Sequence, residues 1–471
     1  MNDLPLSLTV RSRLPGLVFP PLAAAAALPL HAMFLQLERS QWLPAQDLQE
    51  LQRRQLDALL AHVWANVPWY HPRLRAAGIA PGRPLDLRAW RSLQPLTRRE
   101  IQDAGAGLHS DRMPPEHGAV SSTRTSGSTG EPVEVLRSGL DQLLWRAVTL
   151  RDHAWHRRDL SGTLCSIRAG IARTPDGAWR SGWGTATDAL FDTGPSAALP
   201  IDTDLEAQAR WLGERNPHYL LIYPTVLAAL LERLQSGRVE LPRLREVRTI
   251  GEVLPDATRA LCRKVLGVPV TDLYSSNEVG NIALQCPMSG LYHVQSESLM
   301  VEVLDAGGAP CAPGATGRVV VTNLHGYAMP LLRYELRDYA EVAPACPCGR
   351  GLPALRRIQG RVRNMLVTPQ GETRWPLLGY AGYREAAPVR QYQVAQLARD
   401  HLEFRLVTDR PLLQVEEAAL AAILKGSLGD FARIDFRYFS HLSPGANGKF
   451  EEFVSLMPAP PGMAPEGSAA P

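Results

Sequence analysis

The sequence predicts an α/β protein with a large N-terminal body of several subdomains and a small α+β domain at its C-terminal end. Between residues 140 and 351, short β-branched runs alternate with helical stretches, a pattern typical of a largely parallel sheet covered by helices. After residue 360 roughly a hundred residues follow, which is enough chain for a separate small domain. The chain has 471 residues, of which 45% are hydrophobic and 21% charged, so disorder of the whole chain is excluded.

The predicted elements follow one another from the N-terminus. Residues 1–44 form an apolar arm, and leucines at helical intervals indicate a helix at about 44–66. The other expected elements are strands at 219–223, 247–250, 268–273, 299–304 and 318–322 with helices at 225–235 and 256–266 in the N-terminal domain (residues 45–359), then strands at 402–407 and 434–438 with a helix at 415–424 in the C-terminal domain (residues 360–456). Residues 457–471 lack periodic apolar residues and are expected to be disordered.

The N-terminal arm contains a run that could indicate export or a membrane anchor. Residues 14–37 carry no Asp, Glu, Lys or Arg and follow two arginines. Four prolines interrupt this run, whereas a membrane span needs about 20 residues of uninterrupted helix. We therefore expect an arm that packs on the body of a cytoplasmic protein, without stable membrane insertion.

The overall charge excludes one class of partner. Lys and Arg number 50 against 47 Asp and Glu, which gives a net charge of +3 and no chain-wide basic field for nucleic acid. Six cysteines in so long a chain do not form a disulfide framework. The function must therefore be sought in local motifs.

The most informative stretch is SSTRTSGSTGEP, residues 121–132. Seven of its twelve residues carry hydroxyl groups, and a Gly, Ser and Thr loop presents hydroxyl and backbone N–H donors that suit phosphate oxygens. By composition alone a surface turn or a flexible linker is an equal alternative. The Walker ending GK[ST] is missing, so a P-loop NTPase is not expected.

Five further segments follow this loop in order. They are Ile250-Gly251-Glu252, Tyr274-Ser275-Ser276-Asn277-Glu278, Arg333-Tyr334-Glu335-Leu336-Arg337-Asp338, Gly360-Arg361-Val362-Arg363-Asn364 and Asn447-Gly448-Lys449. Together with Thr125–Pro132, they resemble the motifs of the adenylate-forming (ANL) superfamily, and within it the phenylacetate–CoA ligase family and its capsular-polysaccharide-biosynthesis-type relatives. The resemblance covers about residues 45–455 and implies the body-and-lid fold of that superfamily.

The resemblance implies an ATP- and Mg²⁺-dependent enzyme that converts a carboxylic acid, expected to be aromatic, into an acyl-adenylate with release of pyrophosphate. A thiol, with coenzyme A as the expected acceptor, then takes the acyl group. The alternatives are transfer to a carrier-protein thiol or to an amine, and, in a different class, a zinc-stabilised binding protein that has lost the chemistry. A homodimer is left open.

The resemblance also assigns roles to individual residues. The nucleotide would contact Gly251, Glu252 and Tyr274 around adenine and Asp338 at the ribose. The residues expected at its phosphates are Thr125, Ser126, Gly127, Ser128, Thr129 and Gly130, and Ser275, Ser276 and Asn277 are further cofactor-binding residues. Glu278 would bind Mg²⁺, and Lys449 would place a cation on the substrate carboxylate and the α-phosphate. Arg361 is assigned to the catalytic residues with Glu278 and Lys449. It lies in Gly360–Asn364, which resembles the family's hinge motif but departs from it because Arg363 and Asn364 replace two aspartates. This departure makes the thioester-forming half-reaction less certain than adenylation.

Three cysteines and one histidine form a second constellation. Cys286, His293, Cys346 and Cys348 offer three thiolates and one imidazole, a tetrahedral zinc set within the β-rich section 286–350, and the resemblance includes a similar pattern. Buried thiols near a turn are the alternative. A site with four protein ligands has no open position, so a structural role is expected.

The carboxylate pocket is assigned by resemblance alone. It maps onto Tyr223, Pro224, Ile250 and Leu273, and an aromatic face at Tyr223 would suit a flat acid. Core packing explains the same residues equally well.

Overall fold

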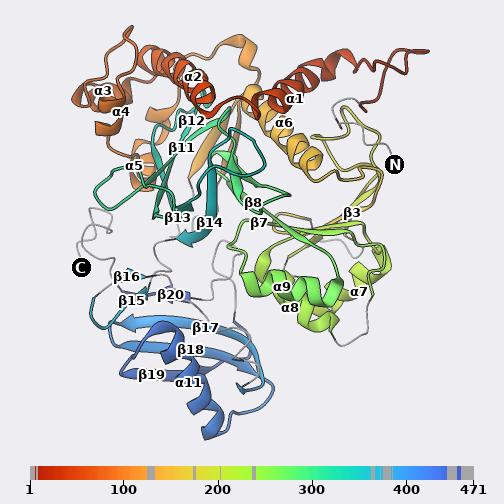
Figure 1. Cartoon of the computed structure of the whole chain (residues 1–471), viewed down its shortest axis with the longest axis vertical. Coiled ribbons are helices and arrows are strands. Elements are labelled where there is room, and N and C mark those ends of the chain that lie inside the picture. The colour runs from red at the N-terminus through yellow and green to blue at the C-terminus, as the bar shows by residue number, and fades with distance from the viewer. Residues whose placement is uncertain are drawn as a thin grey trace.

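The computed structural model describes most of the chain. The described residues are 6, 9–124, 133–172, 177–201, 203–235, 240–361, 366–371, 373–374, 383, 386–442 and 453–457. They form a large upper body and a smaller lower domain at the C-terminal end (Figure 1).

A mixed sheet of 12 strands runs through the body, in the order β11-β12-β13-β14-β10-β9-β8-β7-β6-β3-β5-β4. Its strands are β3 (Leu164–Arg168), β4 (Ala178–Arg180), β5 (Ser196–Pro200), β6 (Tyr219–Ile222), β7 (Glu246–Ile250), β8 (Val270–Ser276), β9 (Gly280–Gln285), β10 (Tyr292–Val294), β11 (Leu299–Leu304), β12 (Thr316–Asn323), β13 (Tyr334–Val342) and β14 (Ala354–Arg361). Strands β5, β3, β6, β7 and β8 are parallel, whereas β9 turns back on β8 and begins the antiparallel half. The predicted β-rich section is therefore a continuation of the same sheet, because one hairpin reverses the strand direction.

Helices cover both faces of this sheet. They are α1 (Leu28–Ser40), α2 (Ala45–Asn66), α3 (His71–Ala76), α4 (Leu87–Ser92), α5 (Arg98–Ala104), α6 (Gly139–Trp155), α7 (Leu205–Arg215), α8 (Pro224–Leu234) and α9 (Asp256–Leu266). Val270 belongs to the core cluster under α7, α8 and α9, whereas Leu273 packs with the cluster of α1 and α6. Successive side chains of a strand point to opposite faces, so these helices form two layers. The predicted α/β class is confirmed.

The C-terminal domain has its own sheet and core. Strands β17 (Val389–Ala398), β18 (His401–Thr408), β19 (Arg433–Tyr438) and β20 (Phe453–Ser455) pair in the order β19-β18-β17-β20, beside α11 (Gln414–Leu428). Phe404, Tyr392 and Leu420 are buried in its core. Two short hairpins complete the described strands, β1 (Ser121–Arg124) with β2 (Glu134–Arg137) and β15 (Leu366–Val367) with β16 (Thr373–Arg374). The predicted α+β class of this domain is confirmed, and its boundary at residue 360 stays a prediction.

The N-terminal arm contains helix α1, which was not expected because four prolines interrupt this part of the sequence. Pro29 lies in the first turn of α1, where a missing N–H costs no hydrogen bond. Leu30, Phe34 and Leu37 are buried in the cluster that includes α6, so this part of the arm packs on the body as expected. Among the described residues, we find no helix with the length and apolar character needed to cross a membrane.

Candidate functional site

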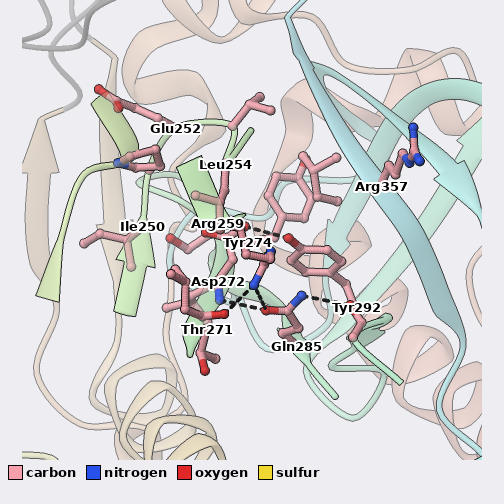
Figure 2. A pocket seen from close by; sticks show the side chains of 18 of the residues that line it. Ile250, Glu252, Leu254, Arg259, Thr271, Asp272, Tyr274, Gln285, Tyr292 and Arg357 are labelled. Carbon is pink, nitrogen blue, oxygen red and sulfur yellow. Dashed lines mark hydrogen bonds between the residues drawn. The ribbon is translucent and has the colours of Figure 1, made fainter. Parts of the chain in front are cut away.

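A large open cavity of about 2200 Å³ extends from Glu246 and Val270, at the amino ends of β7 and β8, to Ile250 and Ser276 at their carboxyl ends. Ligands of α/β proteins bind at this edge of the sheet, where strand order and direction change. The cavity is lined by residues from β7, β8, β13 and β14 and by Phe453 of the C-terminal domain. Figure 2 shows several of the lining side chains, among them Glu252, Tyr274 and Asp272.

Tyr274 and Asp338 meet across this cavity. Tyr274 is buried on β8, and its hydroxyl donates a hydrogen bond of 2.9 Å to Asp338 Oδ2 on β13. Both residues line the cavity, although they are 64 positions apart in the chain. The pair presents a fixed carboxylate beside an aromatic ring.

The Gly251-Glu252 turn is anchored to the start of helix α8. Gly251 has φ of +77°, a left-handed conformation that glycine adopts without strain. Glu252 Oε2 accepts hydrogen bonds from the backbone N–H of Thr225 at 3.0 Å and from its hydroxyl at 2.8 Å. The positive end of the helix dipole favours a carboxylate at this position. The described contacts of Glu252 therefore fix the turn that borders the cavity.

Glu278 is held by two residues, Arg98 and Tyr334, that the sequence motifs did not predict as site residues. Arg98 Nη1 lies 3.3 Å from Glu278 Oε1, and the hydroxyl of Tyr334 donates to the same oxygen at 3.5 Å. The side chains of Arg98 and Glu278 are only 11% and 10% exposed. Burial, together with the nearby Glu278 charge, raises the pKa of Tyr334. A cation that binds Glu278 would have to compete with Arg98.

Arg98 was missed because it carries no local signal. It stands in the first turn of α5, whose cap is formed by Thr97 and Glu100, and such a Thr-Arg-Arg-Glu segment has the features of an ordinary helix start. It reaches Glu278 over 180 positions of sequence.

The structure brings Cys286, His293, Cys346 and Cys348 together, with their ligand atoms within 4.8 Å of one another. Sγ of Cys346 lies 3.9 Å from Sγ of Cys286, close to the separation of roughly 3.8 Å that follows from two Zn–S bonds of about 2.3 Å in a tetrahedron. Sγ of Cys348 lies 3.2 Å from Nε2 of His293. The donor set therefore fits a zinc ion with four protein ligands.

The histidine of this cluster is oriented for metal binding. Its Nδ1 lies 3.3 Å from the carbonyl oxygen of Leu352, so Nδ1–H donates there and Nε2 keeps its lone pair toward the sulfurs. Burial lowers the pKa of His293 to about 4, which keeps the imidazole neutral. Arg350 beside the cluster stacks over the rings of Trp155 and Trp42 and donates to Gln41, which ties this corner to the N-terminal helices.

The four residues of the predicted acid pocket all line the cavity. Ile250 and Leu273 are register neighbours on β7 and β8, and Tyr223 and Pro224 lie at the junction of β6 and α8. Burial raises the pKa of Tyr223, which keeps its hydroxyl protonated. Their position agrees with a pocket wall, and their role as one stays a prediction.

No family model matches the chain. The phenylacetate–coenzyme A ligase of Escherichia coli is 25% identical over 335 residues, 68% of this chain and 72% of that protein. The enzyme of the same name from Thermus thermophilus is 27% identical over 344 residues, 69% and 73% of the two chains.

Solved structures agree in fold. A 2-hydroxyisobutyryl-CoA ligase in the postadenylation state superposes with a TM-score of 0.68 at 17% identity, over 89% of this chain and 91% of that one. An anthranilate CoA ligase in complex with anthranoyl-AMP gives a TM-score of 0.53 at 16% identity, over 70% and 64%. The chain belongs to the adenylate-forming superfamily. The sequence-based prediction of an enzyme similar to phenylacetate–CoA ligases is confirmed at this low identity.

Several superfamily motifs lie outside the described residues. These are Thr125–Pro132 with the predicted phosphate-binding Thr125, Ser126, Gly127, Ser128, Thr129 and Gly130, the replaced positions Arg363 and Asn364, and Lys449. Of the hinge motif, the backbone of Arg361 pairs with Asp338 between β14 and β13. Gly360 has φ of +79°, a left-handed conformation that glycine adopts without strain, and a Cβ there would lie 2.9 Å from Val253 Cγ2.

The remaining motif residues lie at the end of β8 and in the turn after it. Ser275, Ser276 and Asn277 form the end of the strand and the turn into β9, and all three line the cavity. The hydroxyl of Ser276 accepts the backbone N–H of Val279 at 3.2 Å, which closes that turn.

Proposed function

We propose that this enzyme uses ATP to convert a carboxylic acid into an acyl-adenylate, releases pyrophosphate, and transfers the acyl group to the thiol of coenzyme A. The observation that carries the proposal is the meeting of three separate motifs, Gly251-Glu252, Tyr274–Glu278 and Asp338, around one cavity. Homology to phenylacetate–CoA ligases supports the same reaction.

The chain's own residues would bind and orient the nucleotide. Asp338, held by Tyr274, would accept hydrogen bonds from the ribose hydroxyls, and the ring of Tyr274 would contact adenine beside Gly251. The loop Thr125–Gly130 would donate to the β- and γ-phosphates. The substrate carboxylate then attacks the α-phosphorus and the bond to pyrophosphate breaks, with Lys449 neutralising the charge that builds on the phosphate oxygens.

Two metals are part of the proposal. Mg²⁺, held by Glu278 once Arg98 is displaced, would reduce the repulsion between the carboxylate and the triphosphate. Cys286, His293, Cys346 and Cys348 would hold a structural zinc ion, and four protein ligands leave this ion no open position for catalysis.

An aromatic acid is the proposed substrate class. Tyr223 and the apolar side chains of Ile250 and Leu273 suit such an acid, because flat rings stack on aromatic faces. The phenylacetate–coenzyme A ligases are named for an aromatic acid, whereas the 2-hydroxyisobutyryl-CoA ligase of similar fold is named for an aliphatic one.

Different observations support different acceptors of the acyl group. Coenzyme A is favoured by the names of the relatives, whereas Arg363 and Asn364 in the hinge motif favour adenylation with transfer to a carrier-protein thiol or an amine. In the coenzyme A reaction the thiol sulfur attacks the acyl carbon, AMP leaves and the thiol proton is lost to solvent.

The test is an ATP–pyrophosphate exchange assay with a panel of aromatic and aliphatic acids. We expect exchange with at least one aromatic acid, and AMP release accelerated by coenzyme A more than by a carrier protein or an amine. No exchange with any acid would overturn the adenylation, and acceleration by another acceptor alone would overturn the transfer to coenzyme A.

A further inference from the structure

A row of polar side chains crosses three neighbouring strands next to Tyr274. The register pairs Leu273 of β8 with Leu284 of β9, the neighbours of Asp272 and Gln285, and it pairs Gln285 with Tyr292 of β10. Asp272 stands two positions before Tyr274, so the row lies on the face that carries Tyr274. Figure 2 shows the three side chains together at the cavity, which they line.

Hydrogen bonds fix this row from several directions. The hydroxyl of Tyr292 donates to Asp272 Oδ2 at 2.8 Å, and the hydroxyl of Thr249 on β7 donates to Oδ1 at 2.6 Å. The backbone N–H of Asp272 donates to Gln285 Oε1 at 2.9 Å. Asp272 is only 5% exposed, and a buried carboxyl that loses a donor pays the full cost of its desolvation. The position of β8 is therefore sensitive to these contacts.

The same row is joined to the zinc cluster through the chain. Gln285 directly precedes Cys286, and Tyr292 directly precedes His293. The hairpin that supplies two of the four candidate zinc ligands thus also supplies both partners of Asp272 from that side of the sheet.

We propose that Tyr292 and Asp272 are positioning residues that connect the zinc cluster to the nucleotide site. A zinc ion bound by Cys286 and His293 of this hairpin, together with Cys346 and Cys348, would hold the Tyr292 hydroxyl against Asp272. Asp272 would then fix β8 so that Tyr274 stays in contact with Asp338. This inference rests on the proposed function, since it assumes that Tyr274 and Asp338 receive the nucleotide. It adds a role for the zinc cluster in nucleotide affinity.

The first test is Tyr292→Phe in the full chain, with AMP affinity measured by calorimetry. Loss of one buried hydrogen bond should weaken AMP binding and raise the KM for ATP about fivefold, with the KM for the acid and the zinc content unchanged. Tyr219→Phe is the matched control. Tyr219 is a buried tyrosine on β6 of the same sheet, and its hydroxyl accepts a hydrogen bond of 2.8 Å from the backbone N–H of Asp159. Unchanged AMP affinity in Tyr292→Phe, or an equal loss in both variants, would overturn the inference.

The second test removes zinc from the parent protein with a chelator, so it does not depend on any variant that fails to fold. Stripping should weaken AMP binding about fivefold and speed hydrogen exchange in residues 270–276 relative to residues 219–222. In Tyr292→Phe, stripping should add no further loss, because the connection is already broken. If stripping weakened AMP binding as much in Tyr292→Phe as in the parent, the proposed connection would be contradicted.

Different results would overturn the proposed function and the inference about Tyr292 and Asp272. A parent protein that binds no adenine nucleotide would overturn the proposed function together with this inference. Parental AMP binding that is indifferent to both stripping and Tyr292→Phe would overturn the inference alone.

Discussion

The zinc cluster and the nucleotide side of the cavity share strands of one sheet but are held in opposite ways. In the cluster the four ligand atoms converge on one point, ready for a small ion. On the nucleotide side Glu278 is engaged by Arg98, which a bound cation would displace. A preassembled cluster suits a permanent structural ion, whereas contacts that can be exchanged for substrate suit a site that fills and empties in each turnover.

The largest effect is expected from Lys449→Ala, which affects the nucleotide side only. Loss of a cation that acts in the transition state should reduce ATP–pyrophosphate exchange by about 10²–10³-fold while AMP affinity and zinc content stay close to the parent. Lys425→Ala is the matched control, since Lys425 lies exposed on α11 beside Asp430. Exchange at the parental rate in Lys449→Ala would contradict the assigned role.

Asp338→Asn should have the next largest effect. The amide keeps an acceptor for the Tyr274 hydroxyl but loses the charge that strengthens hydrogen bonds to a ribose, so the KM for ATP should rise about tenfold. Steady-state kinetics with 2′-deoxy-ATP sharpen the test, because the parent should show a similar rise and the variant little further change. Parental kinetics for ATP in Asp338→Asn would place the ribose elsewhere.

Cys348→Ser tests the other side of the comparison. Serine is a poor zinc ligand, so metal analysis should show loss of zinc, and the melting temperature should fall by roughly 5–10 °C. Exchange activity should fall only about fivefold at temperatures where the variant is folded, through weaker nucleotide binding. Cys311→Ser is the control, because Cys311 is half-buried and lies outside the four-residue cluster. A parent protein without zinc would contradict the structural assignment.

Sequence reasoning succeeded where the signal is local. Helix α9 has the predicted bounds, Asp256–Leu266, because an amphipathic segment is enclosed by Pro255 and by Gly267 in the left-handed conformation. The spacing of the cysteines and His293 likewise predicted a set that the structure brings together. Helix α1 was missed because Pro29 was interpreted as an interruption, although the first turn of a helix tolerates proline.

What depends on contacts between distant segments could not be predicted. The Tyr274–Asp338 pair joins two motifs that were each found, but the hydrogen bond between them follows only from the sheet order. The hydrogen bond from Tyr292 to Asp272 similarly requires β8, β9 and β10 to be neighbours. A single sequence carries no signal for such cross-strand pairs, because each residue alone is compatible with ordinary core packing.

The smallest effect is expected from Arg98→Gln, and it tests whether the nucleotide side exchanges its contacts. In the structure the Arg98 guanidinium forms an ion pair with the Glu278 carboxylate, so a divalent cation must displace the guanidinium before it binds Glu278. Because the 3.3 Å contact is longer than a charge-assisted hydrogen bond of about 2.7–2.9 Å, removal of Arg98 should lower the Mg²⁺ concentration for half-maximal exchange by only about two- to threefold. Glu278→Gln should shift the same concentration in the opposite direction, since it removes the proposed ligand itself. Equal Mg²⁺ requirements in the parent and both variants would show that Glu278 belongs to a fixed structural pair, and the contrast with the zinc cluster would then be lost.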